Sequence, residues 1–176
     1  MSKKKFCILF SGAIGSSKTP IATFLSEEIG LPIFNNDSIR TEVLEDFSDT
    51  GETIVVEREL AYNFRRDERL IKMLNRGESF ILDASIDRRW DMLKPGLELY
   101  GYRWFIISLD LKKSLLLKLY KSKGYTISDS LDKTIKDHNL FVKKNKQEIG
   151  LHISDKNFKD RMELSLEAVT KWKKLL

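Results

Sequence analysis

The feature that most constrains this chain is a nine-residue stretch, Ser11-Gly-Ala-Ile-Gly-Ser-Ser-Lys-Thr19. An apolar run, residues 6–10, precedes it, and an amphipathic segment, residues 21–29, follows it. A strand, a glycine-bearing loop, a Lys-Thr pair and a helix form, in that order, the pattern of a phosphate-binding loop. In such a loop the backbone N–H groups at the helix start point toward a polyphosphate. The stretch therefore predicts nucleotide binding at residues 12–19.

Each position of this loop has an expected role. The nucleotide-binding residues are expected to be Gly12, Ala13, Ile14, Gly15, Ser16, Ser17, Lys18 and Thr19. Lys18 is expected to reach the terminal phosphates as a catalytic cation, and the Thr19 hydroxyl to hold Mg²⁺. Ser17 stands where the pattern G-x-x-x-x-G-K-[ST] has its last glycine, and serine fits there if its backbone lies in a commonly populated basin. The alternative is an ordinary strand–turn–helix whose glycines serve only the turn.

Composition limits the classes of protein that this chain can belong to. Its 176 residues suffice for a single domain, 1–176, and 41% hydrophobic with 32% charged residues is typical of a globular protein. The net charge of +5 is spread along the chain and mildly favours anionic partners such as nucleotides or nucleic acid. The single cysteine, Cys7, excludes an intrachain disulfide. The first apolar run is too short for a membrane span, so we expect a cytoplasmic protein without a membrane partner.

Apolar runs alternate with segments of helical periodicity. We expect strands at 5–10, 32–34, 79–83, 102–109 and 150–153, and helices at 20–29, 54–75, 111–120, 130–147 and 159–175. Alternation of strands and helices predicts an α/β fold with a parallel sheet and helices on both faces. Right-handed crossovers then place the ligand at the carboxyl ends of the strands.

Asp37 and Arg40 follow the second expected strand and are three residues apart at the start of a helix, so they share a face. A carboxylate there can accept a proton from an acceptor hydroxyl, and a guanidinium can bind a phosphate or carboxylate on the same molecule. Alternatively, Asp37 only caps the helix and Arg40 is solvated. The spacing by itself favours this second interpretation.

Asp83 ends the third expected strand, which is the usual position for a carboxylate that orders Mg²⁺ beside a phosphate-binding loop. A turn or cap residue is the alternative. Asp87 follows closely and is interpreted as a helix cap, while Arg88 or Arg89 is expected to face the cleft.

Three further polar residues are given structural interpretations. Asp110 is expected to cap the helix 111–120. His138 lies on the apolar face of its helix and is interpreted as a core or rim histidine with a satisfied hydrogen bond. His152 is interpreted as a packing residue in a short strand.

Three motifs together resemble the small P-loop kinases. They are residues 12–19, Asn36-Asp-Ser-Ile-Arg40 and Ile81-Leu-Asp-Ala-Ser85. The most similar groups are the polynucleotide 5′-kinases, the zeta-toxin-like kinases and the chloramphenicol phosphotransferase-like enzymes. The resemblance implies the three-layer P-loop NTPase fold, with a five-stranded parallel sheet of order 2-3-1-4-5 and a small lid at about 118–130. It also implies that Asp37 is the general base and that Arg40 grips the acceptor.

The expected lid departs from this family. Family lids usually carry an arginine, but none occurs between Trp104 and Asp160. The candidates that remain in or beside the lid are Lys118, Lys121 and Lys123, and the alternative phosphate contacts are Arg88 and Arg89. Lysine lacks the planar fork of arginine, so it is not an equal substitute.

The sequence therefore predicts a phosphotransferase that uses ATP and Mg²⁺ and moves the γ-phosphate to a hydroxyl. The acceptor is a nucleic-acid 5′-hydroxyl, a nucleotide or a small metabolite. Two other classes stay open. Ser17 and the arginine-free lid favour an ATP-binding switch or weak ATPase without an acceptor, and the pI of 9.2 favours a nucleic-acid-binding module. The acceptor, the preference for adenine or guanine and the oligomeric state are not determined by the sequence.

Overall fold

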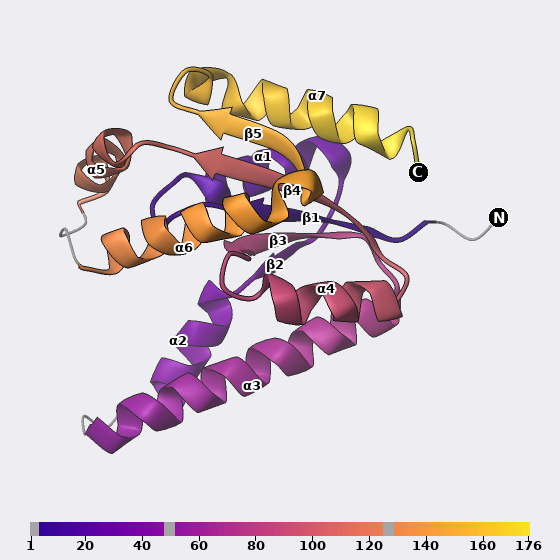
Figure 1. Cartoon of the computed structure of the whole chain (residues 1–176). Helices are drawn as coiled ribbons and strands as arrows, with labels where there is room; N and C mark the ends of the chain where they lie inside the picture. Colours follow the sequence, from indigo (N-terminus) through magenta and orange to yellow (C-terminus); the bar gives the residue numbers. More distant parts are fainter. Residues whose placement is uncertain (1–3, 48–51, 125–128) are drawn as a thin grey trace.

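A computed structural model describes residues 4–47, 52–124 and 129–176 (Figure 1). Within these ranges the strands are β1 (Phe6–Ser11), β2 (Ile33–Asn35), β3 (Phe80–Ser85), β4 (Arg103–Asp110) and β5 (Ile149–Ser154). All four neighbouring pairs are parallel, and the spatial order is β2-β3-β1-β4-β5. This arrangement confirms the expected five-stranded parallel sheet and places β1 at its centre.

The helices are α1 (Lys18–Ile29), α2 (Asp37–Asp46), α3 (Glu52–Arg76), α4 (Trp90–Leu99), α5 (Lys113–Ser122), α6 (Asp129–Asn145) and α7 (Arg161–Lys173). Two short 3₁₀ turns, η1 (Lys146–Glu148) and η2 (Phe158–Asp160), flank β5. The helix α4 was not expected, because Pro95 and Gly96 in its last turns are residues that usually interrupt helices. No helix in the described ranges has the length and apolar character needed to cross a membrane.

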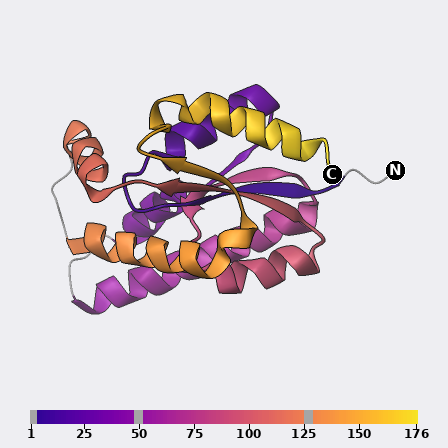
Figure 2. The same cartoon turned by 45° about the horizontal axis from the view of Figure 1, so that its top comes forward.

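The side chains of β1 supply two apolar layers, one on each face of the sheet. Phe6, Ile8 and Phe10 pack in the layer that α1 and α7 cover, whereas Cys7 and Leu9 pack in the layer that α3 and α4 cover. Figures 1 and 2 show these helix pairs on opposite sides of the sheet. Because β1 is buried on both faces, its sequence is a continuous apolar run without alternation.

The parallel strands end in polar residues at one edge of the sheet. Asn35 of β2 is in register with Asp83 of β3, and Asp110 of β4 is in register with Ser154 of β5. The central strand ends between them at Ser11. The sheet order therefore gathers these strand ends on the side where α5 lies in Figure 1.

The packing of β5 on β4 leads to a stability prediction. A Cβ atom at Gly150 would lie 2.3 Å from the Phe105 ring, and that ring is itself 5.3 Å from the Trp172 ring, centroid to centroid. Gly150→Ala should lower the free energy of unfolding by about 1–3 kcal/mol in denaturant titrations, because the ring has little room to move.

Gly96→Ala in α4 is the matched control, because a Cβ atom there meets nothing within 4 Å. This change should leave stability unchanged or raise it by up to about 1 kcal/mol. A Gly150→Ala protein as stable as the wild type would contradict the packing of β5 on Phe105.

Candidate functional site

The β1–α1 loop (residues 12–17) turns tightly between the central strand and the first helix. The Ser16 N–H donates to the carbonyl of Ala13 at 3.2 Å. Gly15 has φ of 77°, and a Cβ atom there would come within 2.6 Å of the Tyr120 ring on α5. Glycine is therefore required at this position both by the backbone conformation and by the close approach of α5.

The Lys18 ammonium is held by this loop. It donates to the carbonyl oxygens of Gly12 at 2.9 Å and Ala13 at 2.8 Å, and it lies 3.2 Å from the hydroxyl of Ser16. Burial lowers the pKa of Lys18 to about 8, although the negative charges of Asp87 and Asp83 oppose the shift. The side chain therefore keeps most of its positive charge at neutral pH.

Ser17 has a conformation that the sequence does not reveal. Its φ of 74° and ψ of 34° are left-handed, and it is the only residue other than glycine with positive φ in the described ranges. The condition under which serine fits easily, a commonly populated basin, is therefore not met. The glycine that the loop pattern places here supplies this conformation without strain, whereas a residue with a Cβ atom pays about 1–2 kcal/mol.

A hydroxyl and a carboxylate meet beside the loop. Thr19 Oγ1 donates to Asp83 Oδ1 at 3.1 Å. Burial raises the pKa of Asp83, and the negative charge of Asp37 acts in the same direction, whereas the Thr19 hydroxyl opposes the shift. A hydroxyl and a carboxylate are hard oxygen ligands that suit Mg²⁺, which takes few protein ligands and completes its shell with phosphates and water.

Asp37 is close enough to influence the pKa of Asp83, so the ends of β2 and β3 bring the two carboxylates into one region. The helix α2 begins at Asp37, and the Asp37 N–H donates to the side-chain oxygen of Asn35 at 2.7 Å. The N-cap residue is Asn36, so the interpretation of Asp37 as the cap is wrong. Its carboxylate is exposed.

Arg40 stacks on an aromatic ring. Its guanidinium lies 4.7 Å from the ring centroid of Tyr62 on α3, and Arg66 lies 5.1 Å from the same ring. Arg66 is buried and its Nε donates to Asp67. The stacking restricts the position of the Arg40 side chain, which is otherwise exposed at the start of α2.

The two arginines after β3 bind other helices. Arg89 donates to the Asp67 carboxylate of α3 at 2.7 Å, and Arg88 lies 3.6 Å from the Asp137 carboxylate of α6. Arg88 is the more exposed of the two. Their engagement makes them poorer candidates for a free phosphate contact than the lysines near α5.

Lys118, Lys121 and Lys123 are exposed on α5 and just after it. Of these three lysines, Lys123 is the one whose positive charge helps to lower the pKa of Lys18. The structure therefore brings Lys123 toward the loop. Residues 125–128 of the expected lid lie outside the described residues.

Asp87 and Asp110 are not helix caps, contrary to the sequence interpretation. The N-cap residues of α4 and α5 are Arg89 and Lys112. Asp87 instead accepts hydrogen bonds from the Ser11 hydroxyl at 2.5 Å and the Gly12 N–H at 3.1 Å. These contacts fix the start of the β1–α1 loop.

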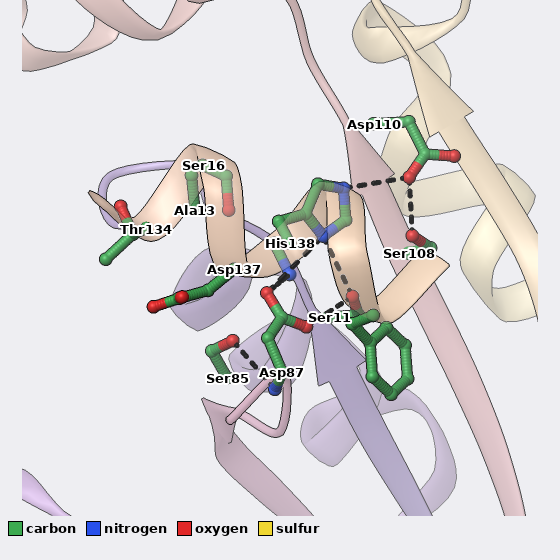
Figure 3. A network of polar contacts seen from close by, with 12 residues as sticks. Ser11, Ala13, Ser16, Ser85, Asp87, Ser108, Asp110, Thr134, Asp137 and His138 are labelled. Atoms are coloured by element: carbon green, nitrogen blue, oxygen red, sulfur yellow. Dashed lines mark hydrogen bonds and ion pairs between the residues drawn. The ribbon is translucent and has the colours of Figure 1, made fainter. Parts of the chain in front are cut away.

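His138 of α6 lies between these two carboxylates, as Figure 3 shows. Its Nδ1 is 2.9 Å from Ser11 Oγ and 3.4 Å from Asp87 Oδ2, and its Nε2 is 3.0 Å from Asp110 Oδ1. His152 of β5 contacts the other oxygen of Asp110, so it is not only a packing residue. Two sequence features could have indicated this cluster: a histidine on the apolar face of its helix and polar residues at the ends of the strands.

The pKa shifts in this cluster follow from its contacts. Burial alone lowers the pKa of His138, but the hydrogen bonds to Asp110 and Asp87 raise it to about 9. Burial raises the pKa of both carboxyl groups, but the hydrogen bonds that they accept outweigh that effect: those from His138 and Ser11 at Asp87, and those from His138, Ser108 and His152 at Asp110. The pKa of Asp87 is lowered, and that of Asp110 falls to about 2.

Comparison with known proteins identifies the fold. No family model matches the chain, and no curated protein matches it significantly in sequence. A candidate kinase of Chloroflexus aurantiacus has a TM-score of 0.69 at 10% identity, covering 99% of this chain and 98% of that one. The tunicamycin resistance protein of Deinococcus radiodurans has a TM-score of 0.64 at 15% identity, covering 96% and 95%. The deoxyadenosine kinase of M. mycoides has a TM-score of 0.63 at 15% identity, covering 97% and 100%.

These likenesses, at identities of 10–15%, show that the chain has the fold of P-loop kinases. They agree with the sheet order and with the position of the β1–α1 loop at the end of the central strand.

The strain at Ser17 leads to a prediction. Ser17→Gly should raise the free energy of unfolding by about 0.5–1 kcal/mol, because relief of the left-handed conformation exceeds the entropy that glycine adds to the unfolded chain. Ser17→Ala keeps the Cβ atom and should bring no such gain. Thermal unfolding of both variants checks this, and a destabilised glycine variant would argue against strain at this position.

Proposed function

We propose that the chain is a phosphotransferase that moves the γ-phosphate of ATP, with Mg²⁺, to a hydroxyl-bearing acceptor. The observation that carries the proposal is the placement of Lys18, Thr19, Asp83 and Asp37 around the ends of β1 and β3. A cation, a metal-binding oxygen pair and a free carboxylate are the groups that phosphoryl transfer needs.

The β1–α1 loop is the proposed nucleotide site, with residues 12–19 around the phosphates. Lys18 would donate hydrogen bonds to the terminal phosphates, and Thr19 and Asp83 would hold Mg²⁺. Bound Mg²⁺ supplies charge neutralisation at the phosphate oxygens. The chain's own contribution is to position the nucleotide and to concentrate positive charge at a partly buried site.

Asp37 is the proposed general base. It is exposed and lies near Asp83, so it can accept a proton from an acceptor hydroxyl that faces the nucleotide. Arg40 is the proposed acceptor-binding residue, because its guanidinium is held against Tyr62 beside Asp37 and can bind a phosphate or carboxylate.

The proposal leaves the acceptor at the level of an alcohol. Solved structures with this fold include a deoxyadenosine kinase and a gluconokinase, whose acceptors differ in chemistry. A 5′-hydroxyl end, a nucleotide and a small metabolite are the classes to screen, with labelled ATP as donor.

The main competing function is an ATP-binding switch or weak ATPase, which Ser17 and the arginine-free lid favour. Release of ADP at a rate that no acceptor changes would support the switch or weak ATPase. Salt-dependent oligonucleotide binding without ATP turnover would support a nucleic-acid-binding module instead.

Asp37→Asn separates the proposed base from a structural role. Asparagine keeps the size of the side chain but cannot take a proton, so phosphoryl transfer should fall by roughly 10²–10⁴-fold. The melting temperature should hardly change, because the Asp37 side chain is exposed and its backbone N–H is already bonded to the Asn35 side chain. Turnover is measured with the acceptor that the screen identifies.

Asp91→Asn is the matched control. Asp91 also lies in the first turn of a helix and is exposed, but it belongs to α4 and pairs with Lys144. The Asp91→Asn protein should have the activity of the wild type. Full activity in Asp37→Asn as well would remove Asp37 from the mechanism.

Lys123 is the proposed cation from the lid side. Lys123→Ala should lower kcat by roughly tenfold or more with little change in ATP affinity, because charge develops on the phosphoryl oxygens in the transition state. Lys118→Ala changes an exposed lysine in the middle of α5 and should keep kcat. A Lys123→Ala protein with the kcat of the wild type would exclude a catalytic role for Lys123.

A further inference from the structure

A cluster of charged and polar groups lies next to the start of the β1–α1 loop and has no role in the mechanism proposed above. Its members come from four elements and one loop: Ser11 of β1, Asp87 of the loop after β3, Asp110 of β4, His138 of α6 and His152 of β5. His138 is only 5% exposed, and the Asp87 side chain only 4%. The charges of these two enclosed groups must be balanced by neighbouring groups within the protein.

The hydrogen-bond partners of His138 determine the protonation state of its ring. A carboxylate only accepts hydrogen bonds, so the Ser11 hydroxyl donates its proton to Asp87 and must accept from His138 Nδ1. On the other side, Nε2 faces an Asp110 oxygen that already accepts from the Ser108 hydroxyl. Both ring nitrogens are therefore donors, and the ring is an imidazolium.

The charge of Asp87 matters because of where it lies. Among the groups that hold the proton on Lys18, the negative charge of Asp87 has the largest effect. The same carboxylate accepts the N–H of Gly12, the first residue of the loop. An uncompensated negative charge at this place would repel a polyphosphate and draw Lys18 away from it.

We propose that His138 is a positioning residue whose buried, doubly protonated ring cancels the charge of Asp87 beneath the nucleotide site and fixes the start of the loop. This inference rests on the proposed nucleotide binding at the loop. It makes α6 part of the site, although α6 contributes no group that touches the reacting atoms.

A second contact ties the same helix to the loop. The Ile14 N–H donates to Thr134 Oγ1 at 3.3 Å, and Thr134 is one helical turn before His138. The groups that face the ring are Asp87, Asp110 and Ser11, while Asp137 on the same helix pairs with Arg88 and His152 reaches the ring only through Asp110. Loop and helix are thus joined at both Ile14 and Ser11.

The charge of the ring affects stability in a defined pH window. In the folded chain the pKa of His138 is about 9, above its ordinary value of 6.5. The stabilisation is fully present below pH 6.5 and is lost as the pH rises toward 9. The lowered pKa of Asp87 works at the other end, since its contribution is lost as the pH falls below the ordinary carboxyl range.

The first experiment measures the charge directly. The chain has two histidines, so in His152→Gln the remaining imidazole signal belongs to His138. Titration of its Cε1 proton by NMR should give a pKa of about 9. A midpoint at or below 6.5 would overturn the inference, and this result does not depend on nucleotide binding.

The second experiment measures MgATP affinity by calorimetry in four proteins: the wild type, His138→Asn, Asp87→Asn/His138→Asn and His152→Gln. His138→Asn should bind roughly tenfold or more weakly, because Asp87 keeps an unbalanced charge. The double variant removes both charges and should recover most of the affinity. His152→Gln, which changes the other histidine on Asp110, should bind like the wild type.

His138→Asn and the double variant also distinguish an electrostatic role of His138 from a purely structural one. A merely structural role predicts that the double variant binds no better than His138→Asn, and that result, or wild-type affinity in His138→Asn, would overturn the inference. A wild-type protein that does not bind MgATP would overturn the proposed function. The NMR titration would then decide the charge of His138 independently.

Discussion

The partial burial of the Lys18 side chain is the constraint on which the rest of the site depends. An ammonium removed from water needs acceptors and negative charge nearby, or it loses its proton. The β1–α1 loop meets the first need by turning the carbonyls of Gly12 and Ala13 toward Nζ. The second need is met by Asp83 and Asp87, which the sheet order brings to the end of β1.

These two carboxylates have different surroundings although they are only four residues apart, Asp83 near the end of β3 and Asp87 just after it. Asp83 faces Thr19 and is only partly buried, so it can serve a metal ion. Asp87 is enclosed by Ser11, Gly12 and His138, so its charge is satisfied within the protein. One carboxylate is therefore available to ligands, while the other shapes the loop. This division explains how a site for a polyanion can contain several acidic residues.

The sequence predicted the parts that depend on local order. The apolar run, the loop and the Lys-Thr pair identified β1 and α1, and the family resemblance supplied the sheet order that the structure confirms. The left-handed torsion of Ser17 could not be predicted, because it follows from the packed loop. Asp87 and Asp110 were assigned to caps because they adjoin helices, whereas their partner His138 lies on a helix distant in sequence. Contacts of this kind leave no local pattern.

The most direct test of the account is calorimetric titration of MgATP into the wild type and Lys18→Ala. Alanine removes the buried cation while leaving the loop glycines and the Thr19–Asp83 pair in place. The account predicts a clear binding isotherm for the wild type and affinity weakened by roughly tenfold or more in the variant, because a charge-assisted contact to phosphate is lost. Equal affinity in the two proteins would contradict the central claim that the β1–α1 loop and Lys18 form a nucleotide site.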